Sequence, residues 1–225
     1  MTNSSIAHIA SSFFDALFDT DRPKALSVIN RAIGRNIAPE DLVFSVVLPG
    51  IERMTDSMVD TEKTNLSQHF IASQICEEVI DLLLPLFSGA PSFQGTVILG
   101  TSSGDFHGLG KKIVRGCLRS SLFSVVDLGI NVTAERFVEE AVSQKAAIIG
   151  VSSMMVHTAL SDQGPRRVRQ LLHERGLEER IKLVVGGAPY KFDPELYRTV
   201  GADAWGENGM EAVRVITRLL GAQKP

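Results

Sequence analysis

The sequence predicts an α/β domain with a doubly wound, parallel five-stranded sheet over residues 96–225, preceded by an all-α four-helix bundle over residues 1–88. Two observations lead to this prediction. Up to residue 88 the apolar residues repeat only with helical spacing, whereas from residue 96 short β-rich runs alternate with helical patterns. Residues 89–95, Gly-Ala-Pro-Ser-Phe-Gln-Gly, have the composition of a linker between the two parts.

Four amphipathic helices are expected in the N-terminal part. The first covers residues 4–18, and the second begins after Asp21 and ends near Gly34. The third begins at Pro39, and Pro49 is expected to kink or interrupt it because proline has no N–H to donate. The fourth runs from about residue 66 to 87, and together they predict a small helical bundle.

Five short apolar runs after the linker are expected to form strands, each followed by a helix. Parallel strands need such crossover helices, so the sheet should have helices on both faces, as in flavodoxin-like proteins. The expected strands are Val97–Leu99, Phe123–Val126, Ala147–Val151, Lys182–Val185 and Ala202–Trp205, and the expected helices lie near residues 109–119, 133–144, 162–175, 193–199 and 208–220.

Composition and charge exclude several classes of function. A net charge of −3 without a basic run argues against a nucleic-acid or anionic-membrane partner. No apolar run reaches the roughly 18 residues that span a bilayer, and the N-terminus lacks the pattern of a signal peptide, so a cytoplasmic location is expected. Cys76 and Cys117 are far apart in separate helical patterns, which favours two small buried residues over a disulfide or zinc site.

The glycine-rich stretch Gly100–Gly110 contains the first candidate for chemistry. It follows the first expected strand, and Asp105 stands two residues before His107. A histidine can offer one ring nitrogen to a metal while a carboxylate orients the other, so His107 is a candidate metal ligand. The alternatives are a surface histidine and an aspartate that caps the next helix.

Three strand ends consist of small residues: Gly100–Gly104, Gly150–Ser153 and Gly186–Ala188. In open α/β sheets ligands bind beyond the carboxyl ends of the strands, so this pattern predicts a deep, narrow slot beside His107. The glycine spacing fits neither a P-loop nor a dinucleotide-binding motif, which argues against a nucleotide hydrolase or a simple NAD enzyme.

Taken in order, Gly104-Asp-x-His107-x-x-Gly110, Ser152-x-Met154 and Gly186-Gly187 resemble the signature of the cobalamin-binding domain of methionine synthase and of the corrinoid proteins of methyltransferase systems. The resemblance covers residues 96 to 220. The N-terminal helices resemble the four-helix cap that covers the upper face of the corrin in these proteins. Mutase cobalamin subunits usually lack this cap, which argues against a mutase. Met154 departs from the family's usual leucine.

The resemblance implies that cobalamin binds base-off, with His107 replacing the dimethylbenzimidazole base as the lower cobalt ligand and Asp105 hydrogen-bonded behind it. The displaced nucleotide tail would enter the slot. The implied cofactor-binding residues are Gly104, Asp105, Phe106, His107, Gly108, Gly110, Ser152, Met154, Thr158, Gly186 and Gly187, and those implied for the upper face are Met54, Met58, His69 and Phe70.

A methyl carrier is the function that the resemblance implies. Cobalt would take a methyl group from a methyl-donor methyltransferase and pass it to an acceptor methyltransferase, with a reductive activating protein as a third partner. The chain would be a subunit of such a system and not catalytic alone. Two other hypotheses remain: a cobalamin sensor or storage protein without methyl transfer, and a flavodoxin-like protein that binds another cofactor.

Overall fold

The computed structural model describes residues 3–59, 64–87 and 93–222. It divides the chain into two compact units, Met1–Ser92 with Arg119–Ser121, and Phe93–Leu118 with Leu122–Pro225. Residues 89–92 of the expected linker, together with residue 88 before it, lie outside the described residues. No described helix is both long enough and apolar enough to cross a bilayer.

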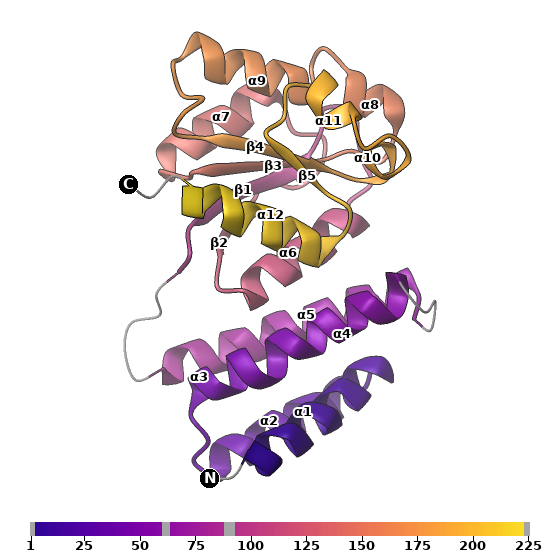
Figure 1. Ribbon diagram of the computed structural model, residues 1–225, viewed down its shortest axis with the longest axis vertical. Coiled ribbons are helices and arrows are strands. Elements are labelled where there is room, and N and C mark those ends of the chain that lie inside the picture. The colour runs from indigo at the N-terminus through magenta and orange to yellow at the C-terminus, as the bar shows by residue number, and fades with distance from the viewer. Residues whose placement is uncertain (1–2, 60–63, 88–92, 223–225) are drawn as a thin grey trace. The chain divides into compact units, whose positions relative to one another are not determined.

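The N-terminal unit is helical, as predicted (Figure 1). Asp21 begins α2 by accepting a hydrogen bond from the Lys24 amide at 2.9 Å. Asn65 and Gln68 form a reciprocal capping box at the start of α5. The elements are α1 (Asn3–Phe18), α2 (Arg22–Gly34), α3 (Pro39–Leu42), a π-helix (Val43–Val47), α4 (Leu48–Val59), α5 (Leu66–Leu83) and a 3₁₀ turn (Leu84–Leu86).

The chain around Pro49 remains helical, so the alternative of an interruption is wrong. A π-helical turn at Val43–Val47 joins α3 to α4, and the Leu48 amide donates to the Val43 carbonyl five residues earlier. A π-helical turn widens the helix by one residue, which is one way to accommodate a proline that cannot donate to the preceding turn. The helical segment therefore continues from Pro39 to Val59.

The C-terminal unit has the predicted sheet of five parallel strands in the order β2-β1-β3-β4-β5. Helices α7 and α9 cover one face, and α6 and α12 cover the other (Figure 1). This is the doubly wound, flavodoxin-like arrangement. The strands are β1 (Thr96–Thr101), β2 (Ser124–Asp127), β3 (Ile148–Ser152), β4 (Lys182–Gly186) and β5 (Ala204–Gly206), and the helices are α6 (Leu109–Ser120), α7 (Ala134–Ser143), α9 (Pro165–Glu174), α11 (Leu196–Thr199) and α12 (Gly209–Ala222).

Two helices of the C-terminal unit were not predicted. Helix α8 (Val156–Leu160) follows β3 almost directly, and α10 (Ala188–Phe192) follows β4. Each has five residues, which is too short for helical periodicity to show in the sequence. They lie at the carboxyl ends of the strands, where the candidate site was expected.

Strands β1 and β3 are neighbours in the sheet, while the chain between them passes through β2 on the other side of β1. The strand order therefore reverses between β1 and β3. The connections that leave these two strands lead to helices on opposite faces of the sheet, α6 after β1 and α9 after β3, and such a point is where open α/β sheets bind ligands. The loop with His107 follows β1, so the fold places it at this topological switch point.

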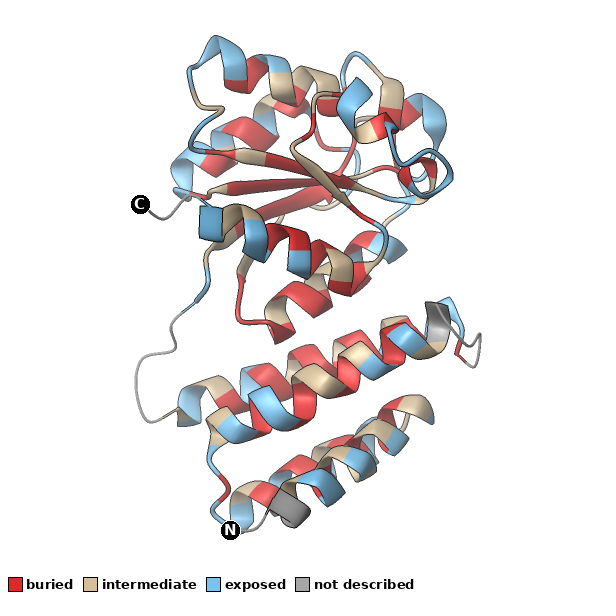
Figure 2. Ribbon diagram, in the orientation of Figure 1, coloured by how far each residue is buried: buried red, intermediate tan, exposed pale blue. Residues whose placement is uncertain are grey.

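The sheet is buried along most of its length, together with the inward side of its helices (Figure 2). Ile98, Ile149 and Leu183 of three adjacent strands belong to one core cluster with Phe137 of α7. A Cβ on Gly100 would lie 2.7 Å from the Phe137 ring. Glycine at this strand end therefore makes room for the helix that covers it.

Gly187 joins β4 to α10 in a conformation that other residues do not adopt readily, with φ of 114°. A Cβ there would lie 2.0 Å from the Ser153 carbonyl oxygen, which is backbone and cannot rotate away. The ends of β3 and β4 therefore approach each other only because residue 187 has no side chain.

Gly187→Ala is expected to destabilise the folded protein by about 3 kcal/mol or more, because backbone strain and a backbone clash add. Chemical denaturation measures the effect. Gly176→Ala is the matched control: Gly176 also has a positive φ, 64°, but a Cβ there would meet nothing within 4 Å. Gly176→Ala should lower the free energy of unfolding by only about 1 kcal/mol. Equal losses of stability at both positions would contradict the close approach of Gly187 to Ser153.

Candidate functional site

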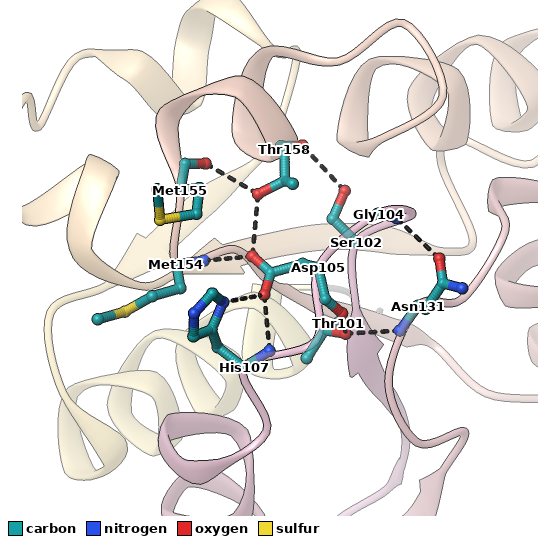
Figure 3. Close-up of polar contacts among 9 residues, drawn as sticks. All are labelled: Thr101, Ser102, Gly104, Asp105, His107, Asn131, Met154, Met155 and Thr158. Carbon is teal, nitrogen blue, oxygen red and sulfur yellow. Dashed lines mark hydrogen bonds and ion pairs between the residues drawn. The ribbon is translucent and has the colours of Figure 1, made fainter.

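The carboxylate of Asp105 is the centre of the polar cluster after β1. Its residue is 1% exposed. One oxygen, Oδ1, accepts hydrogen bonds from the amide and the ring Nδ1 of His107, each at 2.9 Å. The other, Oδ2, accepts from the Met154 amide at 2.6 Å and from the Thr158 hydroxyl at 2.9 Å (Figure 3). The loop after β1 and the loop after β3 thus meet on one side chain.

These contacts determine the charge of Asp105. Burial alone raises the pKa of its carboxyl, but the hydrogen bonds donated by His107, Met154 and Thr158 outweigh burial, so the pKa lies below its ordinary value. The carboxylate is therefore ionised at neutral pH.

His107 has one ring nitrogen occupied and one available. Nδ1 lies against Asp105, so in the neutral ring it carries the proton and Nε2 keeps its lone pair. The side chain is 57% exposed while the carboxylate behind it is fully buried. An imidazole oriented in this way can bind a metal through Nε2, as the sequence predicted.

Thr101 and Asn131 hold the loop of His107 through hydrogen bonds to its backbone. The Thr101 hydroxyl donates to the Asp105 carbonyl at 2.6 Å and accepts from the Asn131 amide at 2.8 Å. The Asn131 side chain accepts from the Gly104 amide at 2.8 Å (Figure 3). Sequence reasoning missed both residues. Asn131 has a positive φ of 54°, a conformation in which asparagine is enriched, but the sequence gives no sign that this loop contacts Gly104.

Thr158 of α8 is shared between two acceptors. Its hydroxyl lies 2.9 Å from Asp105 Oδ2 and 2.8 Å from the Met155 carbonyl oxygen. A hydroxyl has one proton, so it can donate to only one of them at a time, and the ionised carboxylate is the stronger acceptor. The backbone of Thr158 is also held, since its carbonyl accepts from the Ser102 hydroxyl at 2.9 Å. Helix α8 is thereby attached to the loop of His107.

The other glycines and serine named for the cofactor lie at the ends of β3 and β4 and near the start of α6. The Ser152 carbonyl accepts a hydrogen bond from the Ser102 amide at 2.9 Å, and the Gly186 carbonyl accepts one from the Ser153 amide at 2.9 Å. Gly108 lies in the loop before α6, where an added Cβ would be 3.2 Å from Ile130. Gly110 lies in the first turn of α6, and a Cβ there would meet nothing within 4 Å.

Large apolar side chains are exposed next to the polar cluster. Phe106 precedes His107, Ile130 precedes Asn131, and three more residues begin the segment after β3. Monomeric proteins rarely leave several large apolar side chains exposed around one polar site unless something covers them. The exposed residues are Phe106, Ile130, Met154, Met155 and Val156.

The residues named for the upper face lie in α4 and α5. Met54 is fully buried and Phe70 is half-buried, while the side chain of Met58 lies outside the described residues. His69 is 1% exposed, and its Nε2 lies 2.8 Å from the Thr55 hydroxyl. That hydroxyl also lies 3.0 Å from the Ile51 carbonyl oxygen, to which it can donate while it accepts from Nε2. His69 is therefore a buried histidine that is hydrogen-bonded through Nε2, while its Nδ1 has no partner among the described residues.

Burial lowers the pKa of His69 to about 4 from an ordinary value of 6.5. Between these values the unfolded chain binds a proton that the folded chain does not. The contribution of neutral His69 to stability is therefore complete above about pH 6.5 and is lost as the pH falls toward 4.

His69→Gln should remove this pH dependence. Between pH 7 and pH 4 the original chain should lose up to about 3 kcal/mol more stability than the variant, measured by urea denaturation followed by circular dichroism. His8→Gln, at an exposed position of α1, is the control and should behave like the original chain. Parallel loss of stability in the original chain and in His69→Gln would contradict a neutral, buried His69.

Comparison with known proteins gives the family. Residues 95–214 match the family model of the B12 binding domain. Dimethylamine corrinoid protein 3 of Methanosarcina acetivorans is 33% identical over 207 residues, which cover 92% of this chain and 94% of that protein. Trimethylamine corrinoid protein 1 of the same organism is 30% identical over 209 residues, with the same coverage.

Two solved structures share the fold. A cobalamin-binding protein from Desulfitobacterium hafniense superposes with a TM-score of 0.75 and 24% identity, covering 94% of this chain and 98% of that one. A chain of the methanol:cobalamin methyltransferase complex MtaBC from Methanosarcina barkeri has a TM-score of 0.75 and 21% identity, covering 95% of this chain and 80% of that one. The matched family model and the relatives aligned over nearly their whole length show that the chain belongs to the B12-binding domain family.

Proposed function

We propose that this chain binds cobalamin in the base-off form and holds its cobalt from below through Nε2 of His107. The observation that carries the proposal is the pairing of an exposed imidazole with a buried, ionised carboxylate. Asp105 keeps the proton on Nδ1 and thereby directs the lone pair of Nε2 outward.

The remaining residues fit such a cofactor. Among the described residues no group of three or more His, Cys, Asp or Glu side chains could hold a bare metal ion. A single imidazole suits a metal whose other ligands are already supplied by a macrocycle. The exposed apolar residues around His107, among them Phe106 and Val156, would lie against the corrin and lose their contact with water.

Bound cobalamin would supply a cobalt centre able to carry a methyl group. The chain's own residues would control the proton behind it. While Nε2 is a ligand, the Nδ1 proton stays in the hydrogen bond to Asp105. Asp105 would thus keep the ring of His107 in the tautomer whose Nε2 lone pair is available to cobalt, and Thr158 would hold Asp105 in place.

The names of the relatives support a carrier in a methylamine methyltransferase system. Dimethylamine and trimethylamine corrinoid proteins align with nearly the whole chain. We propose a methyl-donor methyltransferase and an acceptor methyltransferase as partners, with a reductive activating protein that restores the cofactor. In this arrangement the chain is a subunit and has no methyl-transfer activity alone.

The lower-ligand role is tested by reconstitution with cobalamin and absorption spectroscopy. His107→Ala should change the cobalt coordination spectrum and weaken binding by at least about tenfold, since loss of even an outer partner of a ligand costs that much. His157→Ala is the matched control, because His157 is an exposed histidine beside Thr158 in α8. The proposal fails if the spectra of His107→Ala and the original chain are identical.

The carrier role is tested separately, with the reconstituted chain in its methylated form. Incubated alone with a methyl acceptor it should show no turnover, and addition of an acceptor methyltransferase from a methylamine system should start methyl transfer. Rapid turnover by the isolated chain would exclude a carrier. Tight binding with no transfer to any methyltransferase would indicate the sensor or storage hypothesis instead.

A further inference from the structure

Lys111 is a buried cation in the first turn of α6, shortly after His107. The residue is 2% exposed, and its Nζ donates to Oδ1 of Asp127 at the end of β2. The Asp127 side chain is 20% exposed, so the ion pair is largely shielded from water. A positive charge is unfavourable here for two reasons: burial removes its hydration, and the first turn of a helix carries the positive end of the helix dipole.

Stability alone does not account for a lysine at this position. Replacing a buried ion pair by well-packed apolar side chains is often neutral or even stabilising. Methionine would fill nearly the volume of the lysine stem without burying a charge, and α6 already buries the apolar residues Ile113 and Cys117. What the ion pair adds over apolar packing is direction, because a hydrogen-bonded ammonium holds its partner in one geometry.

The carboxylate of Asp127 also holds the loop after β2. Its Oδ1 accepts from the Gly129 amide at 2.9 Å, and Gly129 turns the chain with a positive φ of 90°. The same loop then reaches Asn131. The Asn131 amide donates to the Asp105 carbonyl at 3.0 Å, and its side chain accepts from the Gly104 amide at 2.8 Å (Figure 3).

One segment, residues 127–131, therefore holds the loop of His107 on both sides. Before His107 the attachment is made by Asn131, and after His107 it is made by the ion pair between Asp127 and Lys111. Helix α6 begins between these attachments and the ion pair, since the Lys112 amide donates to the Gly108 carbonyl at 3.1 Å. The backbone of His107 thus lies between two fixed points.

We infer that the ion pair between Lys111 and Asp127 positions His107 for cobalt. It fixes the start of α6 against the end of β2, and with it the backbone from which the imidazole projects. Asp105 determines which ring nitrogen is free, and the ion pair determines where the ring lies. The inference rests on the proposed function, because it gives the pair a role in lower ligation. Both members act through His107 and are positioning residues.

A double-mutant cycle tests whether the ion pair acts through His107. Lys111→Met should weaken the binding of cobalamin at least about threefold and lower the share of histidine-ligated cobalt in the absorption spectrum. In the His107→Ala background the same substitution should change the affinity by less than about twofold, because no lower ligand is left to position. Asp127→Asn keeps an acceptor for the Gly129 amide and should reproduce both results.

Amide hydrogen exchange measures the positioning without any cofactor. The His107 amide donates to Asp105 at 2.9 Å, and in Lys111→Met it should exchange at least about threefold faster because the loop opens more often. The Ser153 amide, which donates to the Gly186 carbonyl at 2.9 Å, is the internal control and should keep its rate. A general loss of stability would accelerate the exchange of both amides.

Lys182→Met is the matched control variant. The Lys182 side chain is 19% exposed, and its Nζ donates to the Glu178 carbonyl at 2.8 Å. Lys182 begins β4, so it lies at the amino ends of the parallel strands, whereas the loop of His107 follows the carboxyl end of β1. This variant should bind cobalamin with the affinity and the spectrum of the original chain.

Three results would overturn the inference. They are an unchanged affinity and spectrum in both Lys111→Met and Asp127→Asn, an equal loss of affinity in the His107→Ala background, and equal acceleration of exchange at the amides of His107 and Ser153. In each case a spectral difference between the original chain and His107→Ala still supports the proposed function. If those two spectra are identical, the proposed function fails, and the inference with it.

Discussion

The buried carboxylate of Asp105 is the interaction on which the site depends. A charge removed from water is strongly unfavourable unless several donors surround it. Here four hydrogen bonds do so, donated by His107, Met154 and Thr158. Because Met154 and Thr158 follow β3 while Asp105 and His107 follow β1, the charge fixes two loops relative to each other at the point where the strand order reverses.

The same interaction makes His107 more than a surface histidine. An exposed imidazole is normally free to change its rotamer and its tautomer, and ordering it has an entropic cost. Asp105 fixes both the rotamer and the tautomer before any ligand binds, since Nδ1 lies 2.9 Å from its Oδ1. The supporting contacts of Thr101 and Asn131 hold the loop itself. Preorganisation of this kind reduces the cost of binding a metal at Nε2.

Much of this arrangement was predictable because it is encoded locally. The five strand–helix units follow from alternating apolar patterns, and Asp105 with His107 is a contact between residues two apart in sequence. The Pro49 region was only partly anticipated, since the sequence shows that proline disturbs a helix but not that a π-turn will absorb the disturbance. The resemblance to cobalamin-binding proteins supplied the identity of the metal, which spacing alone does not.

What escaped prediction depends on contacts between segments distant in sequence. Asn131 reaches Gly104 across 27 residues, and the Met154 amide reaches Asp105 across 49 residues. Helices of five residues, such as α8 and α10, leave no periodic signal. His69 was named for the upper face, but its burial against Thr55 depends on how α4 and α5 pack.

Two features of the site after β1 differ in how far they are satisfied in the folded chain. The Asp105 carboxylate accepts four hydrogen bonds, so the orientation of the His107 ring is set before any ligand binds. Around His107, in contrast, Phe106, Met154 and Val156 expose large apolar side chains to water. This exposure is unfavourable, and a ligand with an apolar face against these side chains would relieve it. Binding free energy would then come mainly from the apolar side chains, while the hydrogen-bonded carboxylate fixes the position of Nε2.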